Sequence, residues 1–298
     1  MRIMVGLTLA AAAAATALAA RDGPRATIRT SDVATFYRLY DAAQGSPSAE
    51  RLQRDYIDRG SAGVREFVPH RILSGAALAE TVRAEPRVYA RARTCLSALP
   101  AAKARLRVAF RRLAQLDPDA RFPPVTILIG RNNSGGTTGP SGVLIGLEVV
   151  CGSSWLQADP ADRLTHLVAH EYGHVQQPAA LEEGETNVLK QSLVEGVAEL
   201  LAELTSGEVS NVHLQRWTRG REREIGTRFL AARASRDLSA WLYNGAGTPD
   251  RPGDLGYWVG YRIAKAYYDR AGDKRAALRT LLDLRDPDAI LAASGWRP

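Results

Sequence analysis

The chain has 298 residues, 45% of them apolar, which is enough for one large globular domain or two smaller ones. Only four of its 39 basic residues are lysines, and the net charge of +7 is spread along the chain without a dense basic block. This distribution argues against nucleic-acid binding, although it leaves open an attraction to an anionic envelope surface.

The first 20 residues have the pattern of a signal peptide. Arg2 is followed by an apolar, alanine-rich run that ends at Ala19 and Ala20, and polar residues 21–24 come next. We therefore predict cleavage after Ala19 or Ala20 and export of the remaining chain to the periplasm or the medium. The alternative is an ordinary alanine-rich N-terminal helix. No later apolar run is long enough to predict a transmembrane segment.

Cys95 and Cys151 are the only cysteines. In an oxidising compartment such a pair can form one disulfide, but two separately buried thiols are also common. Their spacing does not fit a zinc ribbon.

Residues 21–121 predict an N-terminal helical region without a catalytic cluster. Helical spacing of apolar residues, with caps and proline breaks, predicts helices over residues 31–41, 49–58, 75–83, 86–99 and 101–116.

The pattern changes at residue 122, where we place the start of a second region that runs to residue 298. Residues 125–129 and 143–150 are rich in apolar and β-branched residues and predict strands. Residues 131–142 predict a flexible loop. The second strand precedes a histidine-bearing helix. It is either an edge that pairs with an extended peptide or an ordinary internal strand.

The next helix, residues 160–177, carries His170-Glu171-Tyr172-Gly173-His174. Histidines four residues apart point to one side of a helix, so both imidazoles can bind one metal ion. Glu171 is placed to take a proton from a water that the metal activates. Gly173 predicts a close approach of another backbone. His166, one turn earlier, is interpreted as a structural or cleft-wall residue.

Two further segments complete the predicted site. The helix over residues 187–206 carries Glu195 and Glu199 on one face, where carboxylates among apolar residues require a partner or a metal. Glu195 predicts the third ligand of a hydrolytic zinc site, and Glu199 predicts a partner for the second ring nitrogen of a histidine, most simply His170. Helix 256–265 carries Tyr257 and Tyr261, which are either packing residues or donors to an oxyanion. The remaining helices are predicted over residues 209–233, 273–284 and 287–293, with a short segment at 237–243.

The motifs from His170 to His174 and from Glu195 to Glu199 resemble those of the gluzincin metallopeptidases. More closely, the arrangement looks like a group of predicted zinc-dependent proteases of unknown function, in which a helical region precedes the motif and a Gly-Tyr-x-x-Gly-Tyr-like helix follows it. Glu199 departs from the thermolysin branch, which has Asp there. The resemblance implies an α+β, predominantly helical fold, with a zincin-like core and a small β-sheet before the His170 helix.

We therefore predict an exported Zn2+-dependent metallopeptidase that acts on a peptide or protein substrate, with Glu171 as general base and Tyr257 or Tyr261 at the oxyanion. Two alternatives remain open. One is a catalytically inactive binding protein with a zincin fold, and the other is a zinc hydrolase of cell-wall peptides.

Overall fold

The computed structural model describes residues 26–153 and 156–298, so the predicted signal peptide at 1–20 lies outside the described residues. The fold is α+β and predominantly helical, which confirms the predicted class. Its strands are β1 (Ile28–Arg29), β2 (Val125–Leu128), β3 (Gly136–Gly139) and β4 (Gly142–Gly146). Its helical elements are α2 (Ser31–Ala42), α3 (Ala49–Arg51), η1 (Leu52–Ile57), α4 (Ala62–Phe67), η2 (Val68–Ile72), α5 (Gly75–Ala84), α6 (Pro86–Thr94), η3 (Cys95–Ala98), α7 (Leu99–Leu116), α8 (Leu147–Gly152), α9 (Pro160–Gln176), α10 (Ala180–Glu183), α11 (Val188–Ser206), α12 (Val212–Trp217), α13 (Glu222–Ala232), α14 (Leu255–Arg270), α15 (Lys274–Asp283) and α16 (Pro287–Ser294).

The four strands form one small sheet in the order β1-β2-β4-β3. β1, β2 and β4 are parallel, and β3 pairs antiparallel to β4 with Thr137 opposite Leu144. A tight turn joins β3 to β4, and Gly142 after it has a φ of +110°, which favours glycine. β3 is therefore the edge strand on the β4 side of the sheet.

The predicted strand over residues 143–150 is wrong in its second half. The strand ends at Gly146, and Leu147–Gly152 is the helix α8, whose buried residues Leu147, Val150 and Cys151 follow helical spacing. β4 is an internal strand, and the edge strand is β3, inside the stretch predicted to be a loop. Glycines and threonines at residues 136–139 give little strand signal, so pairing with β4 determines this strand.

Three other segments differ from what the sequence predicts. Residues 62–72 form α4 and η2, which we did not predict; Ser61 caps α4 by accepting a hydrogen bond from the backbone N of Val64. Residues 237–243 contain no regular element, and the predicted helix over 209–233 is two helices, α12 and α13.

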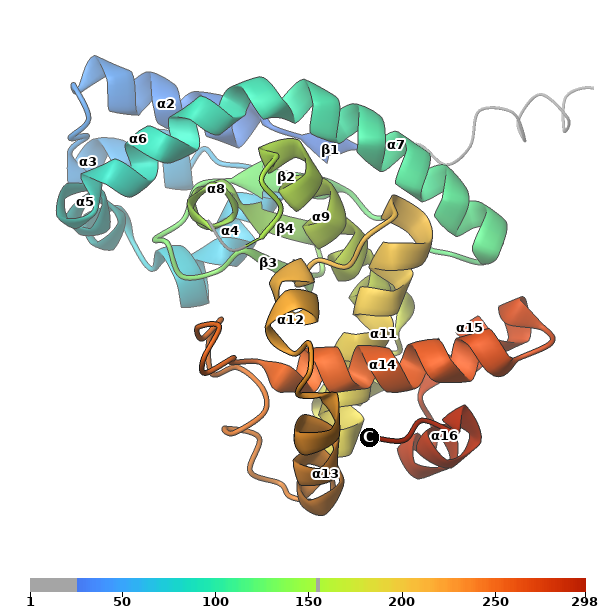
Figure 1. Cartoon of the computed structure of the whole chain (residues 1–298). Helices are drawn as coiled ribbons and strands as arrows, with labels where there is room; N and C mark the ends of the chain where they lie inside the picture. The colour runs from blue at the N-terminus through green and yellow to red at the C-terminus, as the bar shows by residue number, and fades with distance from the viewer. Residues whose placement is uncertain (1–25, 154–155) are drawn as a thin grey trace, which may run out of the picture.

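Helices cover both faces of the sheet (Figure 1). α4 packs closely on one face, because a Cβ on Gly63 would lie 2.9 Å from side-chain atoms of both Leu144 and Thr126. α9 contacts β3 and β4, and a Cβ on Gly136 of β3 would point at Glu171 of α9. Thr137 pairs with Leu144 and therefore faces the same side of the sheet as α4. Side chains alternate along a strand, so Gly136 faces the other side. α9 therefore covers the face opposite α4.

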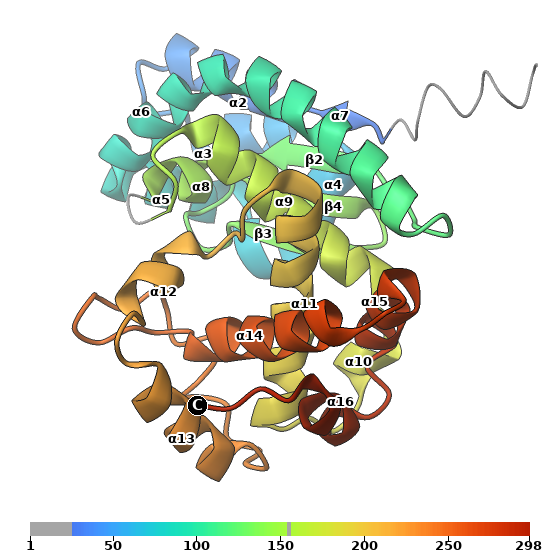
Figure 2. The same ribbon diagram turned by 45° about the vertical axis from the view of Figure 1, so that its right-hand side comes forward.

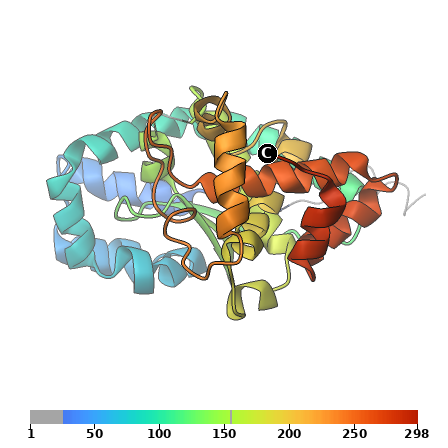
Figure 3. The same cartoon turned by 60° about the horizontal axis from the view of Figure 1, so that its bottom comes forward.

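The second half of the chain is built on α11, which packs against α9 and is crossed by α14 (Figure 2). The crossing is close, since a Cβ on Gly260 would lie 1.7 Å from the carbonyl oxygen of Ser192. Viewed from below, the N-terminal helices and the last two helices lie at opposite ends of the molecule (Figure 3).

The two predicted regions share one hydrophobic core. It includes Phe36 and Leu106 before residue 122 and Ile127, Leu193 and Val259 after it. The division at residue 122 stays a prediction. The secondary structure changes there, but the hydrophobic core is continuous across it.

The structure joins Cys95 and Cys151 in a disulfide, with the two Cα atoms 6.3 Å apart. The bond connects η3 to α8, just before α9. Within the described part of the chain, no helix combines the length and the apolar character that crossing a bilayer requires.

Candidate metal centre

α9 positions two histidines over its last two turns. Asp159 caps the helix by accepting a hydrogen bond from the backbone N of Ala161, and Pro160 occupies the first helical position. The helix is regular from there to Gln176, so His170 and His174 lie one turn apart on the same side. His170 is buried, and the side chain of His174 is 14% exposed at the cleft.

α11 supplies the facing carboxylate. Asn187 caps its start by accepting from the backbone N of Lys190, and Gly207 ends it in the left-handed conformation. Gly173 allows α11 to lie against α9, because a Cβ on this residue would be 2.5 Å from the Cα of Ala198. The predicted close approach at Gly173 is confirmed. It brings Glu195 opposite the two histidines.

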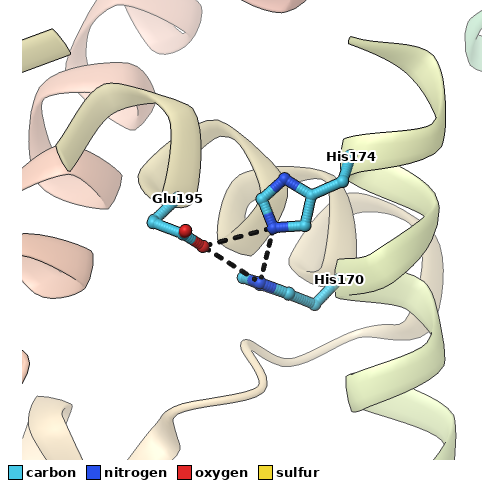
Figure 4. A group of neighbouring side chains, drawn as sticks. All are labelled: His170, His174 and Glu195. Carbon is cyan, nitrogen blue, oxygen red and sulfur yellow. Dashed lines mark hydrogen bonds and ion pairs between the residues drawn. The ribbon is translucent and has the colours of Figure 1, made fainter. Parts of the chain in front are cut away.

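The three predicted ligands converge on one point (Figure 4). The Nε2 atoms of His170 and His174 are 3.1 Å apart, and Oε2 of Glu195 lies 3.4 Å from the first and 3.2 Å from the second. Two ligands about 2.05 Å from a tetrahedral zinc ion are separated by about 3.3 Å. The triangle therefore has the size of one face of a zinc tetrahedron, and these residues fit the ion.

Charge in this triangle also favours a cation. Burial by itself would raise the pKa of Glu195, but His174 and His170 outweigh that effect and hold the pKa well below its usual value. Burial would lower the pKa of His170, yet Glu195 and Glu199 raise it well above its usual value. Positive charge is thus stabilised here, and a divalent ion would supply it in place of protons.

Residues around the triangle orient the rings. Oε1 of Glu199 lies 3.2 Å from Nδ1 of His170, and Oε1 of Gln177 lies 2.9 Å from Nδ1 of His174. The amide oxygen of Gln177 favours a proton on Nδ1 of His174 through a hydrogen bond, and the nearby charge of Glu199 favours one on Nδ1 of His170. Both leave the Nε2 lone pairs facing the triangle. Glu199 is itself held by the side chains of Ser210 and Asn211, at 2.5 and 2.7 Å.

Glu171 lies beside the triangle under strand β3. Its carboxylate is buried, and burial raises its pKa above the usual value for Glu. A Cβ on Gly136 would come within 2.4 Å of Oε1 of Glu171, so the glycine leaves room for this carboxylate. A carboxylate with a raised pKa holds a proton more readily than an ordinary Glu does, as a general base must.

The two predicted tyrosines lie in different places. Tyr257 lines the cleft, with its ring stacked on His170 at a centroid distance of 6.1 Å. Tyr261, one turn further along α14, is buried deeper and lines a small space beside Glu199 and Leu214. The structure therefore brings Tyr257, but not Tyr261, into the cleft.

His166 also lies outside the triangle. Its Nδ1 is 2.8 Å from Oγ of Ser206, so it joins α9 to the end of α11.

The cleft has a volume of about 380 Å3. Besides the predicted residues, it is lined by Gly136, Thr137 and Thr138 of β3, and by Gln191, Val194 and Tyr243. No motif in the sequence predicts that these residues line the cleft. β3 has weak strand character, and Tyr243 lies 48 residues after Glu195 in an irregular segment without a motif.

Comparison with known proteins agrees with this geometry. A family model described as "Predicted Zn-dependent protease (DUF2268)" matches residues 137–285, which is half of the 298-residue chain. The match begins within β3 and includes α9, α11 and α14. No curated protein and no solved structure matches the chain. By the extent of the family match, the chain belongs to the DUF2268 family of predicted Zn-dependent proteases.

Proposed function

We propose that this protein is an exported zinc metallopeptidase that hydrolyses peptide bonds in the cleft between β3 and α11. The observation that carries the proposal is the triangle formed by His170, His174 and Glu195, with the buried carboxylate of Glu171 beside it in the same cleft. Structural zinc sites are closed by four protein ligands, whereas catalytic sites have three and leave one position open.

His170, His174 and Glu195 would hold the zinc ion. When bound, zinc lowers the pKa of water and polarises a carbonyl group, which is the chemistry that peptide hydrolysis requires. Glu171 would take the proton of the attacking water and deliver it to the leaving amine nitrogen. Its raised pKa supports both transfers, because the group must accept a proton and then release it.

Tyr257 is the better placed of the two predicted tyrosines to stabilise the oxyanion. Its side chain lines the cleft beside His170 and Glu171, whereas Tyr261 does not. Removal of one oxyanion donor typically lowers kcat by about a hundredfold to a thousandfold. Tyr257→Phe tests this role, with Tyr261→Phe as the matched variant from the same helix.

β3 supports a peptide as the substrate. It is the outer strand of the sheet at this side, it lines the cleft, and it runs antiparallel to β4. A free strand edge offers backbone N–H and C=O groups that an extended chain can pair with, independently of its side chains. The scissile bond would thereby be laid across Glu171, which lies beneath Gly136.

Export is proposed from the N-terminal pattern of residues 1–20, and the Cys95–Cys151 disulfide supports it, since such bonds persist in oxidising compartments. The chain purified from culture medium or periplasm should begin at Ala20 or Arg21. N-terminal sequencing of the purified chain measures this directly.

The function is tested by zinc content and peptide cleavage together. The mature protein should contain one zinc ion per chain by elemental analysis and should cleave members of a peptide library. Glu171→Gln should retain zinc and lose turnover, whereas Glu195→Ala should lose both. Full hydrolysis by Glu171→Gln would contradict the role of Glu171.

The same experiment separates the alternatives. One zinc per chain without cleavage of any library peptide would indicate a binding protein. Digestion of purified cell-wall sacculi, with casein left intact, would indicate a hydrolase of cell-wall peptides. That outcome would also agree with the net charge of +7, which favours an anionic envelope surface.

A further inference from the structure

Tyr243 contacts the third metal ligand from outside the predicted motifs. It lies in the irregular segment between α13 and α14, at the rim of the cleft. Its hydroxyl lies 2.8 Å from Oε1 of Glu195, while the residue as a whole is 61% exposed. An aromatic side chain at the surface thus has its polar end directed into the metal centre.

The direction of this hydrogen bond is set by Gln191. Nε2 of Gln191 donates to the Tyr243 oxygen at 2.8 Å, and Oγ1 of Thr186 donates to Oε1 of the same amide at 3.3 Å. Because the phenol oxygen accepts from Gln191, its own proton is available to Glu195. Gln191 and Glu195 are four residues apart on α11, so one helix face supports both ends of the chain Gln191–Tyr243–Glu195.

This contact determines which oxygen of Glu195 faces the histidines. Oε1 is engaged by Tyr243, and Oε2 is the atom that lies 3.4 and 3.2 Å from the Nε2 atoms of His170 and His174. A carboxylate held by one oxygen presents the other in a fixed direction. The groups that surround a metal ligand commonly tune its affinity in this way.

The backbone at Tyr243 is also unusual. Its φ is +59°, in the left-handed region that non-glycine residues, and large aromatic residues in particular, seldom adopt. Such a conformation is strained and is retained where surrounding contacts impose it. At Tyr243 those contacts include the hydrogen bonds to Glu195 and Gln191.

We propose that Tyr243 is a positioning residue for the zinc site: its phenol, oriented by Gln191, holds Oε1 of Glu195 and so turns Oε2 toward the metal. The inference rests on the proposed function, because it assumes that Glu195 is a zinc ligand. Neither Tyr243 nor Gln191 belongs to the two metal motifs.

The test measures zinc affinity on the full mature chain by competition with a chelator of known affinity. Tyr243→Phe keeps the ring and removes only the hydroxyl, and Gln191→Met keeps the length and removes the donor. We expect a 10- to 100-fold loss of zinc affinity for Tyr243→Phe and a smaller loss for Gln191→Met. Tyr267→Phe on α14, away from the cleft, is the control and should match the wild type.

Three further readouts distinguish positioning from a general loss of structure. Tyr243→Phe at saturating zinc should lower kcat while KM changes less than twofold, since the ring at the cleft rim remains. The double variant should lose no more affinity than Tyr243→Phe alone, because both substitutions break one chain of hydrogen bonds. The zinc-free variants should still unfold cooperatively, as the zinc-free wild type does.

A zinc affinity of Tyr243→Phe within twofold of the wild type would overturn the inference, as would fully additive losses in the double variant. In the first case a zinc-loaded, active wild type would leave the proposed function intact. A wild-type chain that binds no zinc would overturn both.

Discussion

Gly173 of α9 lies directly against Ala198 of α11, and no side chain separates the two helices at that point. The contact is one residue from His174 and three from Glu195, so the spacing of the helices sets the distance between the ligands. We expect Gly173→Ala to force the helices apart and to destabilise the protein by about 1–3 kcal/mol or more. Urea unfolding measures this, and zinc affinity should fall in parallel. Gly152→Ala is the matched control, because a Cβ at that position meets no atom within 4 Å. Equal stability of the two variants would contradict the close packing.

Strand β3 limits the space above Glu171, the proposed general base. A Cβ on Gly136 would lie 2.4 Å from Oε1 of Glu171, whereas the nearest atom to a Cβ on the preceding Gly135 is 3.5 Å away. We expect Gly136→Ala to displace the carboxylate and to lower kcat by at least tenfold, since small misplacements of reacting groups are costly. Gly135→Ala should keep wild-type kcat. Steady-state kinetics on one library peptide compares the two, and equal rates would show that Glu171 does not act under β3.

Glu148 makes stability depend on pH. Its side chain is fully buried in α8, and Oε1 accepts hydrogen bonds from the backbone N of Gly130 at 3.0 Å and of Asn132 at 3.1 Å. Burial raises its pKa to about 7 from an ordinary value of 4.5, and those hydrogen bonds only partly oppose this change. The folded state therefore binds the proton more tightly than the unfolded state does. This contribution to stability is complete below about pH 4.5 and is lost as pH rises through 7.

We expect Glu148→Gln to remove this pH dependence, because an amide does not ionise and its oxygen can still accept from Gly130. The free energy of unfolding of the wild type, relative to the variant, should fall by about 3 kcal/mol between pH 4.5 and pH 8. Taking the difference between the two proteins cancels the groups that both share. Parallel pH profiles would contradict the assignment.

The Cys95–Cys151 disulfide should contribute measurably to stability. It spans a sequence separation of 56 residues, for which the chain-entropy model gives about 4 kcal/mol. We expect the double variant Cys95→Ser/Cys151→Ser to unfold at correspondingly lower urea concentration. A reductant should lower the urea midpoint of the wild type to a similar extent and leave the urea midpoint of the double variant unchanged. An unchanged midpoint of the wild type after full reduction would show that the bond is not stabilising.

The metal centre was predictable because its geometry follows from helical spacing. His170 and His174, and likewise Glu195 and Glu199, are four residues apart, and the helix rise and turn then fix their common side. How α9 and α11 meet depends on residues far apart in the sequence, yet Gly173 indicated a close contact. The sequence alone did not reveal that Ala198 is the residue it meets.

Three features could not be predicted from the pattern of their own residues. β3 exists because β4 pairs with it, so its own residues carry little signal. Tyr243 reaches Glu195 through an irregular segment with a left-handed backbone, which no periodicity encodes. The spacing of Tyr257 and Tyr261 put both on one helix face, but a shift of about 6 Å along the axis brings only the first into the cleft.

The disulfide has a consequence for any proteolytic cut in the segment that it closes. Its two cysteines enclose α7, all of β2, β3 and β4, and the half-buried stretch before β3. A cut anywhere in that enclosed segment would leave both fragments covalently joined. The helices α9 and α11 would then stay attached to the N-terminal helices. Such nicked molecules would migrate as one band without reductant and as two bands with it.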